Sequence, residues 1–481
     1  MANIDRTFIT QLLQELNGIF SAEQLKEINE IIRYYNLYDG HGLDDWNDSA
    51  KDYKATKKTS NFMAELIDKQ ARFMFGEYPF IEVVCDNEDA KKQIEKVIKD
   101  INNSNNMPAE LIKAAKDCFI GKRIAIKLSA AEDDKKRGIR ILFKNSLEFV
   151  FETNIDDTKE LQKLIFYYKV KDATSREQEI WWKQKYELKN GRCILNEGKY
   201  NGLAELLETT YDNFDTKLDF IPGDIIINDG LSGDIQGRSD IGKLVSNQLD
   251  YNRIDSEDTD ALLKGMNQIK YTIDADIPLD DYNRPIPYPL GPGAYWDIQT
   301  AATAEGKQAS AGTLNVDFGY TENLKNKLDR NKSAMYELMN IPQLDLESIK
   351  GMITSGKSMN TLYWQMILRV KEKFTAWKPA LENMYKNAIN MAKVYGIYNI
   401  PDVEYDINIE FNSPLPSDEL EEMQADLLKV NAQTMSRKQF ICKWFEMHPD
   451  AADEILQQIA KERELLEDSY SGMLGDDGID E

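Results

Sequence analysis

Residues 359–396, MNTLYWQMILRVKEKFTAWKPALENMYKNAINMAKVYG, carry the longest helical pattern in the chain. At about 1.5 Å per residue the predicted helix is about 55 Å long, more than a small domain needs, which favours a place in a large assembly. Pro379 lies inside the pattern, and we expect a kink there and not an end, because the apolar stripe continues beyond it. The three-and-four spacing is set by Met359, Tyr363, Met366, Ile367, Val370, Phe374, Trp377, Leu381, Met384 and Ile389.

Residues 351–358, GMITSGKS, match the pattern G-x-x-x-x-G-K-S/T of loops that bind phosphates through backbone amides and a lysine. A nucleotide-binding loop follows a buried parallel strand, whereas residues 343–348 contain two acids and only scattered apolar positions. Residues 403–411, the only later candidate for a strand carrying a magnesium-binding Asp, alternate like a half-exposed antiparallel strand. The pattern therefore favours a flexible loop with Thr354 or Ser355 near the helix N-cap, and a P-loop nucleotide-binding protein is the alternative.

Composition limits the possible functions. The 481 residues allow roughly two to four domains, and a hydrophobic content of 42% is typical of a globular protein. The formal net charge of −24 has the wrong sign for a protein that holds nucleic acid tightly. With only two histidines, His41 and His448, we expect no enzyme, no metal site and no cofactor. The cysteines, which have no paired spacing and suit a reducing compartment, are Cys85, Cys118, Cys193 and Cys442.

No apolar run is long enough to cross a bilayer, and the N-terminal residues show no signal-peptide cleavage site, so we expect no membrane partner and a cytoplasmic protein. The first 60 residues predict two helices and then a lysine-bearing loop, residues 47–60, that we interpret as solvated surface. Residues 61–76 predict an amphipathic helix, and residues 139–228 a series of short antiparallel strands separated by turns such as Asn190-Gly191. The fold class is therefore α+β, mainly helical.

Two polar helices flank an insertion rich in proline. The first, residues 239–269, can be capped by Ser239 or Asp240; its thin apolar stripe of Leu244, Leu249, Ile254 and Leu262 predicts a place between solvent and like neighbours. The second covers about residues 320–340. Between them, residues 270–316 form either a linker or, as the aromatic residues favour, a small module that folds against partners. The acids of the first helix are Asp250, Asp255, Glu257, Asp258 and Asp260, and the aromatics of the insertion are Tyr282, Tyr288, Tyr295 and Trp296.

The strand predicted at 403–411 leads into a helical tail from residue 417. In that tail Ser436 and Gln439 have the spacing of a capping box, in which each side chain bonds the backbone of the other. The last eleven residues are acidic, and we expect them to be frayed.

Several blocks, weak alone but in the right order, resemble the portal proteins of tailed bacteriophages, the siphophage-type head–tail connector family. The similarity covers nearly the whole chain. The blocks are Asn61, Ile67-Asp68 and Phe75-Gly76-Glu77-Tyr78-Pro79; Gly237-Arg238-Ser239-Asp240; Tyr251-Asn252, Ser256 and Asp258; Ser355-Gly356-Lys357; and the C-terminal strand, Pro414-Leu415-Pro416 and Gln433-Thr434-Met435-Ser436.

The resemblance implies a portal fold with a wing, a stem, a clip, a tunnel loop and a helical crown. It divides the chain into a wing at 1–238, a stem helix at 239–269, a clip at 270–316, a stem helix at 317–341, a tunnel loop at 342–357, a long kinked wing helix and strand at 358–416, and a crown at 417–481.

The resemblance also implies a ring of about twelve copies at one capsid vertex, through which double-stranded DNA passes without sequence specificity during packaging and ejection. The clip then meets the large terminase subunit and the head–tail connector or adaptor proteins, and the wing meets scaffold and major capsid protein. Such a protein belongs to the virion and is found in the host bacterial cytoplasm during assembly. An acidic scaffold or adaptor that contacts only proteins is a further alternative.

Acidic walls suit a conduit, since they repel phosphate where a basic lining would stall DNA. The acids of the 239–269 helix are therefore expected to line or flank the channel. The family pattern before the long helix is only Ser-Gly, so we interpret Gly351 and Lys357 as unrelated to any nucleotide; Lys350 and Lys357 touching passing phosphates is a hypothesis. The expected channel residues of the tunnel loop are Ser348, Ile349, Lys350, Gly351, Met352, Ser355, Gly356 and Lys357.

Overall fold

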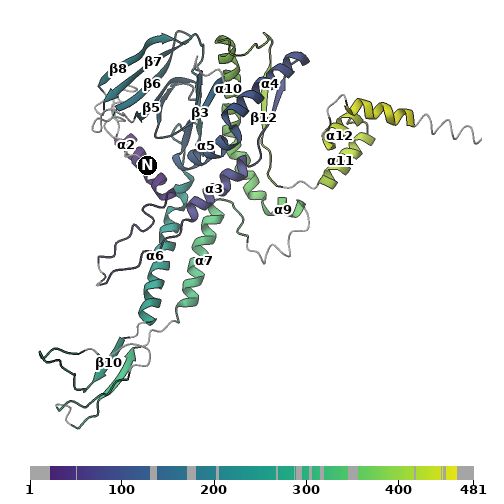
Figure 1. Cartoon of the computed structure of the whole chain (residues 1–481). Coiled ribbons are helices and arrows are strands. Elements are labelled where there is room, and N and C mark those ends of the chain that lie inside the picture. Colours follow the sequence, from purple (N-terminus) through teal and green to yellow (C-terminus); the bar gives the residue numbers. More distant parts are fainter. Residues whose placement is uncertain are drawn as a thin grey trace, which may run out of the picture. The chain divides into compact units, whose positions relative to one another are not determined.

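The chain divides into two compact units, Met1–Gln343 with Gln365–Ser413, and Leu344–Trp364 with Pro414–Glu481. Both helices and sheets are present, so the predicted α+β class is confirmed (Figure 1). The helix predicted before residue 22 and the frayed C-terminus lie outside the described residues. The residues that the computed structural model describes are 22–49, 51, 53–130, 138–170, 180–201, 205–266, 269–286, 288, 295–302, 306–314, 319–344, 356–415, 419–445, 447 and 451–462.

Helix α5 is the centre of a helical layer in the first unit, because it packs against the three helices that precede it in the chain. Its buried face includes Leu111 and Phe119. Helix α3, which was predicted from the sequence, is capped by Asn61, whose side chain accepts the backbone N–H of Ala64 at 3.1 Å. The helices of this layer are α2 (Ala22–Tyr38), α3 (Phe62–Phe75), α4 (Glu88–Asn105) and α5 (Met107–Gly121).

Helix α10 (Trp364–Val394) supplies much of the core of the first unit. It continues through Pro379, which confirms that this proline does not end the helix. The buried ring of Trp377 lies 4.9 Å from that of Phe75 in an edge-on arrangement. The prediction of one helix from Met359 onwards is wrong: α9 (Gly356–Leu362) ends before Tyr363, at the boundary between the two units.

The strands of the first unit form antiparallel sheets, as predicted. One has the order β3-β2-β9 and the other is a meander in the order β4-β5-β6-β7-β8. The turn between β6 and β7 places Asn190 and Gly191 at positive φ (50° and 73°), the geometry for which this pair is favoured. The strands are β2 (Arg123–Ala130), β3 (Ile139–Asn145), β4 (Phe149–Thr153), β5 (Leu161–Val170), β6 (Ile180–Lys189), β7 (Arg192–Asn201), β8 (Leu206–Asp215) and β9 (Gly223–Ile227).

Strand β8 was not predicted from the sequence. Every one of its residues is exposed, so its sequence, LLETTYDNFD, lacks the alternation that burial of one face imposes. Strand β12 (Asp406–Glu410), by contrast, was predicted, and it pairs antiparallel with β1 (Phe80–Val84) in the register Phe80↔Glu410.

Helices α6 (Asp240–Met266) and α7 (Thr321–Leu338) follow the two polar patterns and pack against each other. The predicted end of the first helix is wrong, because Ile269 is the first residue of strand β10 (Ile269–Ile273). Strand β10 pairs antiparallel with β11 (Ser310–Leu314), so part of the insertion is ordered as a β ribbon.

The second unit contains α11 (Glu419–Asn431), α12 (Arg437–Trp444) and a helical stretch at 451–462. The predicted capping box at the start of α12 is confirmed: Ser436 Oγ accepts the N–H of Gln439 at 3.1 Å, and Gln439 Oε1 accepts that of Ser436 at 3.2 Å. Hydrogen bonds from Lys429 and Lys443 hold the pKa of the Asp426 carboxyl at about 2.

Candidate functional site

Helices α6 and α7 lie side by side and are joined by polar contacts (Figure 1). Asp250 Oδ2 accepts Asn331 Nδ2 at 2.9 Å and lies 3.0 Å from Lys327 Nζ. Burial alone would raise the pKa of Asp250, but these two partners lower it below its ordinary value. The buried residues of α7 are all in its second half, so the pair is held mainly there; they are Asn331, Met335 and Tyr336.

The buried face of α6 is mostly polar, and the predicted apolar stripe is only partly buried. Of that stripe Leu244 is buried, Leu249 and Ile254 are half-buried and Leu262 is 44% exposed. A helix can bury polar side chains when each is hydrogen-bonded, and here the partner is the segment between α2 and α3. The four buried side chains at four-residue spacing, which we call the polar ladder, are Gln248, Asn252, Ser256 and Asp260.

The five acids expected to line a channel are spread around α6, since successive residues of a helix are about 100° apart. Each has a partner within the chain: beside the Asp250 contacts, Asp255 pairs with Lys58 at 3.0 Å. Asp260 is buried in the polar ladder and faces the chain itself. The exposed Glu257 pairs with Arg253 at 3.3 Å, and Asp258 accepts Tyr320 Oη at 3.5 Å. A channel-lining role for these acids stays a prediction.

A buried charge cluster holds the first residue of α6. Asp240 is fully buried and lies 2.6 Å from Arg369 Nη2, 2.9 Å from Lys373 Nζ and 2.9 Å from Gln70 Nε2. Burial opposes ionisation of Asp240, but Lys373 and Arg369 outweigh it and lower its pKa. Asp229 joins the cluster at 3.0 Å from Lys373 Nζ. The cluster fixes α6 to α3 and α10 by charge and hydrogen bonds.

The cluster assigns different roles to the two predicted caps. Ser239 Oγ accepts the N–H of Ile241 at 3.2 Å and is the cap, whereas Asp240 is an ion-pair partner. The cations Arg369 and Lys373 were missed, although charged residues four apart inside the apolar stripe of α10 signal a buried counter-charge. Gly237 has φ of +70°, and a Cβ there would meet the carbonyl oxygen of Lys122 at 2.6 Å, so only glycine fits.

Among the described residues of 269–314, none is buried. Tyr288 and Trp296 stack at 4.7 Å between ring centroids, and Lys270 Nζ lies 5.1 Å from the Trp296 ring. Tyr282 and Tyr295 are 80% and 84% exposed. The structure therefore separates the four predicted aromatics into a stacked pair and two side chains that project into solvent, which suits contact with another protein.

Most of the predicted tunnel loop lies outside the described residues. That holds for every expected channel residue from Ser348 to Ser355, and therefore for most of the phosphate-loop pattern. Gly356 and Lys357 are the first residues of α9.

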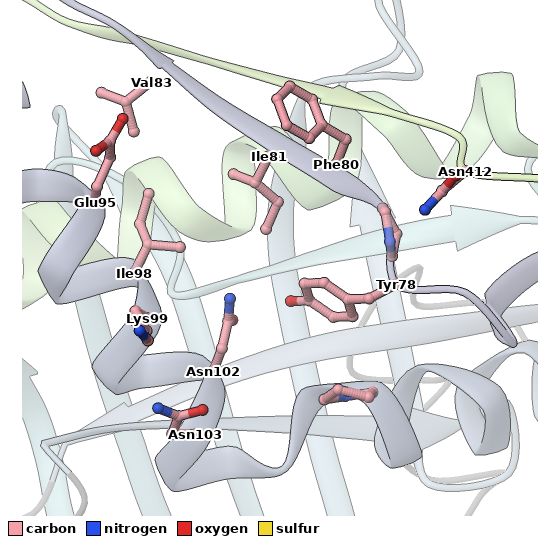
Figure 2. A pocket seen from close by; sticks show the side chains of 12 residues that line it. Tyr78, Phe80, Ile81, Val83, Glu95, Ile98, Lys99, Asn102, Asn103 and Asn412 are labelled. Carbon is pink, nitrogen blue, oxygen red and sulfur yellow. The ribbon is translucent and has the colours of Figure 1, made fainter. Parts of the chain in front are cut away.

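A pocket of about 520 Å³ lies between β1 and α4 and was not predicted (Figure 2). The Tyr78 and Tyr385 hydroxyls are 2.7 Å apart, and Tyr385 donates to Asn102 Oδ1 at 2.7 Å. Burial raises the pKa of Tyr78 from 10.0 to about 12. Ile81 and Ile98 add apolar surface to the same pocket.

Two observations concern other classes of site. Within the described ranges, no three His, Cys, Asp or Glu side chains gather in a way that could hold a metal ion. None of the helices among the described residues combines the length and apolar character required to cross a membrane.

Comparison with known proteins identifies the class. The model of a family of phage portal proteins matches residues 19–466, nearly the whole chain. This is a structural protein of the bacteriophage capsid vertex. The family is described as Phage portal protein, SPP1 Gp6-like, and the chain belongs to it.

Among solved structures, a chain of the "Neck of empty GTA particle computed with C6 symmetry" is similar, with a TM-score of 0.41 and 10% sequence identity. The similarity covers 86% of this chain and 93% of that one. No curated protein sequence matches this chain.

Proposed function

We propose that this portal protein assembles into a closed ring of about twelve copies at one capsid vertex, and that double-stranded DNA passes through the ring during packaging and ejection. The observation that carries the proposal is the course of the chain from α6 through the β10–β11 ribbon to α7, in a family match over residues 19–466. Two polar helices, side by side, leave charged faces for neighbouring copies and for a water-filled hole.

In this proposal α6 and α7 form the stem, and residues 270–316 form the clip. Residues 1–238 and 358–416 form the wing, residues 342–357 the tunnel loop, and residues 417–481 the crown. The net charge of −24 supports a conduit that does not hold DNA. Acidic walls do not displace the counterions that surround DNA, so they do not bind it and it can slide past them.

The clip is proposed to dock the large terminase subunit and then the head–tail connector or adaptor proteins. Its exposed Tyr282 and Tyr295 support this, since aromatic side chains are frequent at the centre of protein interfaces. The wing is proposed to contact scaffold and major capsid protein. The protein then resides in the virion and, during assembly, in the host bacterial cytoplasm.

Shortening residues 343–357 separates the conduit from a scaffold that contacts only proteins. If the tunnel loop contacts moving DNA, rings carrying the shortened loop assemble normally but package less DNA per capsid than the wild type. Normal packaging by such rings contradicts a DNA-contacting tunnel loop and favours the protein-only scaffold.

A further inference from the structure

The α2–α3 linker, described at residues 39–49, 51 and 53–61, runs beside α6 and returns to α3 (Figure 1). Its returning part is bound by the polar ladder one rung at a time. Asn252 Oδ1 accepts the N–H of Ser60 at 3.1 Å, Ser256 Oγ accepts that of Lys58 at 2.9 Å, and Asp260 Oδ1 accepts that of Thr56 at 3.0 Å. The backbone of the lysine-bearing loop is thus attached to α6, while its Lys54, Lys57 and Lys58 are exposed, as their interpretation as solvated surface predicts.

The spacing of the ladder follows from the geometry of the two elements. Four residues of an α-helix rise about 6.0 Å, and two residues of extended chain rise about 6.6 Å. Every second linker residue therefore meets every fourth residue of α6, with a mismatch of about 0.6 Å per rung. Such a match holds for a few rungs, and the structure has three between Thr56 and Ser60.

The Asn252 and Ser256 rungs bind the backbone of the linker, whereas Asp260 also accepts the Tyr53 hydroxyl at 3.2 Å. Asn252 Nδ2 donates to the Ser60 carbonyl at 3.1 Å and Gln248 Nε2 donates to it at 2.9 Å, while Gln248 Oε1 accepts the N–H of Phe62 at 2.8 Å. The contact consequently requires particular side chains on α6. It does not require them at linker positions such as Lys54 and Thr59, which are exposed.

We propose that Gln248, Asn252 and Ser256 are positioning residues that clamp the linker onto α6 and so make α6 one body with α2 and α3. The inference rests on the proposed conduit, in which α6 is a stem helix. Helix α7 lacks an equivalent clamp, because residues 321–330 contain no buried side chain. The clamp therefore makes α6 the fixed helix of the stem and α7 the one whose first half moves.

Hydrogen exchange of the full-length protein, read by mass spectrometry, tests the clamp. Ser256→Ala leaves the Lys58 N–H without its partner, so exchange at Thr56–Ser60 rises on the order of tenfold. Exchange in α6 at 248–260 rises as well. Exchange in α7 at 321–330 is unchanged by the substitution, and in the wild type it is already faster than exchange in α6 at 248–260. Ser256→Thr, which keeps a hydroxyl, restores protection.

The matched control is Thr59→Ala, which removes a hydroxyl from the linker itself and leaves exchange unchanged. Asn252→Leu is a second variant on the neighbouring rung and has the same effect as Ser256→Ala. Equal exchange in wild type, Ser256→Ala and Asn252→Leu contradicts the clamp, as does a linker released without any change in α6. These outcomes are independent of ring formation: a wild-type monomer contradicts the conduit and leaves the exchange pattern interpretable.

Discussion

Asp240 is a fully buried carboxylate with three cationic partners, Arg369, Lys373 and the more distant Lys243. Burying such charges is costly, and the free energy is recovered only when every member of the cluster has its partners. Asp229 and Gln70 complete the set. Asp240 therefore fixes the start of α6 at its junction with α3 and α10.

Replacing Asp240 by Asn leaves Arg369 and Lys373 with less negative charge than their burial requires. We expect a loss of about 3 kcal/mol in the free energy of unfolding, measured by urea denaturation. The control is Asp402→Asn, which breaks the exposed pair of Asp402 with Lys393 and leaves stability close to that of the wild type. Equal effects of the two substitutions contradict a structural role for the cluster.

Asp117 is expected to make the stability of the protein depend on pH in the opposite direction to a carboxylate that is paired with a cation. Burial raises its pKa from 3.8 to about 6, and Glu148 adds to the shift. The folded protein then holds this proton more tightly than the unfolded chain, so stability is highest below pH 4 for this group and falls as the pH rises to 6.

Asp117→Asn removes this dependence, because the amide stays neutral and its oxygen still accepts the Tyr35 hydroxyl, now 3.1 Å from Asp117 Oδ1. We expect the variant to gain roughly 3 kcal/mol on the wild type between pH 4 and pH 7, from urea denaturation at each pH. A difference that does not vary with pH contradicts the raised pKa.

At the scale of elements, the polarity of α6 has two causes, and the sequence suggests only one. Polar residues on a helix indicate solvent or neighbouring copies, which is how the 239–269 pattern was interpreted. The polar ladder shows instead that Asn252 and Ser256 bind the backbone of a segment almost 200 positions earlier in the chain. Periodicity cannot distinguish these cases, because the linker contributes backbone groups that any sequence carries.

Other elements were predictable where one face is buried. The antiparallel pairing of 406–410 and the capping box at Ser436 follow from local pattern. The exposed β8 has no such pattern, and the β1–α4 pocket joins segments whose proximity depends on the fold. The charge cluster could have been suspected from Arg369 and Lys373, but its acids could not be chosen from 83 Asp and Glu residues.

For the exposed aromatic residues between β10 and β11, we expect substitution to weaken partner binding without lowering the stability of the protein. Tyr282→Ser with Tyr295→Ser removes two exposed rings, so the unfolding temperature stays within about 1 °C of the wild type. If the clip docks the terminase large subunit through these rings, the double variant binds it at least about tenfold more weakly, by calorimetry. Unchanged affinity contradicts that docking role. Replacing Leu207, which is 52% exposed on β8, by Ser is the control and leaves terminase binding unchanged.

At the scale of the whole molecule, the single chain leaves charged and apolar surfaces exposed. Both helices of the α6–α7 pair have exposed charged faces, the β10–β11 module has no buried residue among those described, and Leu206, Leu207, Tyr211 and Phe214 are exposed along β8. Exposed apolar surface of this kind is normally covered by a partner. A ring of identical copies covers such surfaces repeatedly with one set of contacts.

Electron cryomicroscopy of the purified native protein, with its mass from native mass spectrometry, tests the ring most directly. We expect a closed ring of about twelve copies with α6 and α7 around a central hole as wide as a DNA duplex. A protein that stays monomeric at high concentration, or a ring with α6 and α7 turned away from its axis, contradicts the conduit.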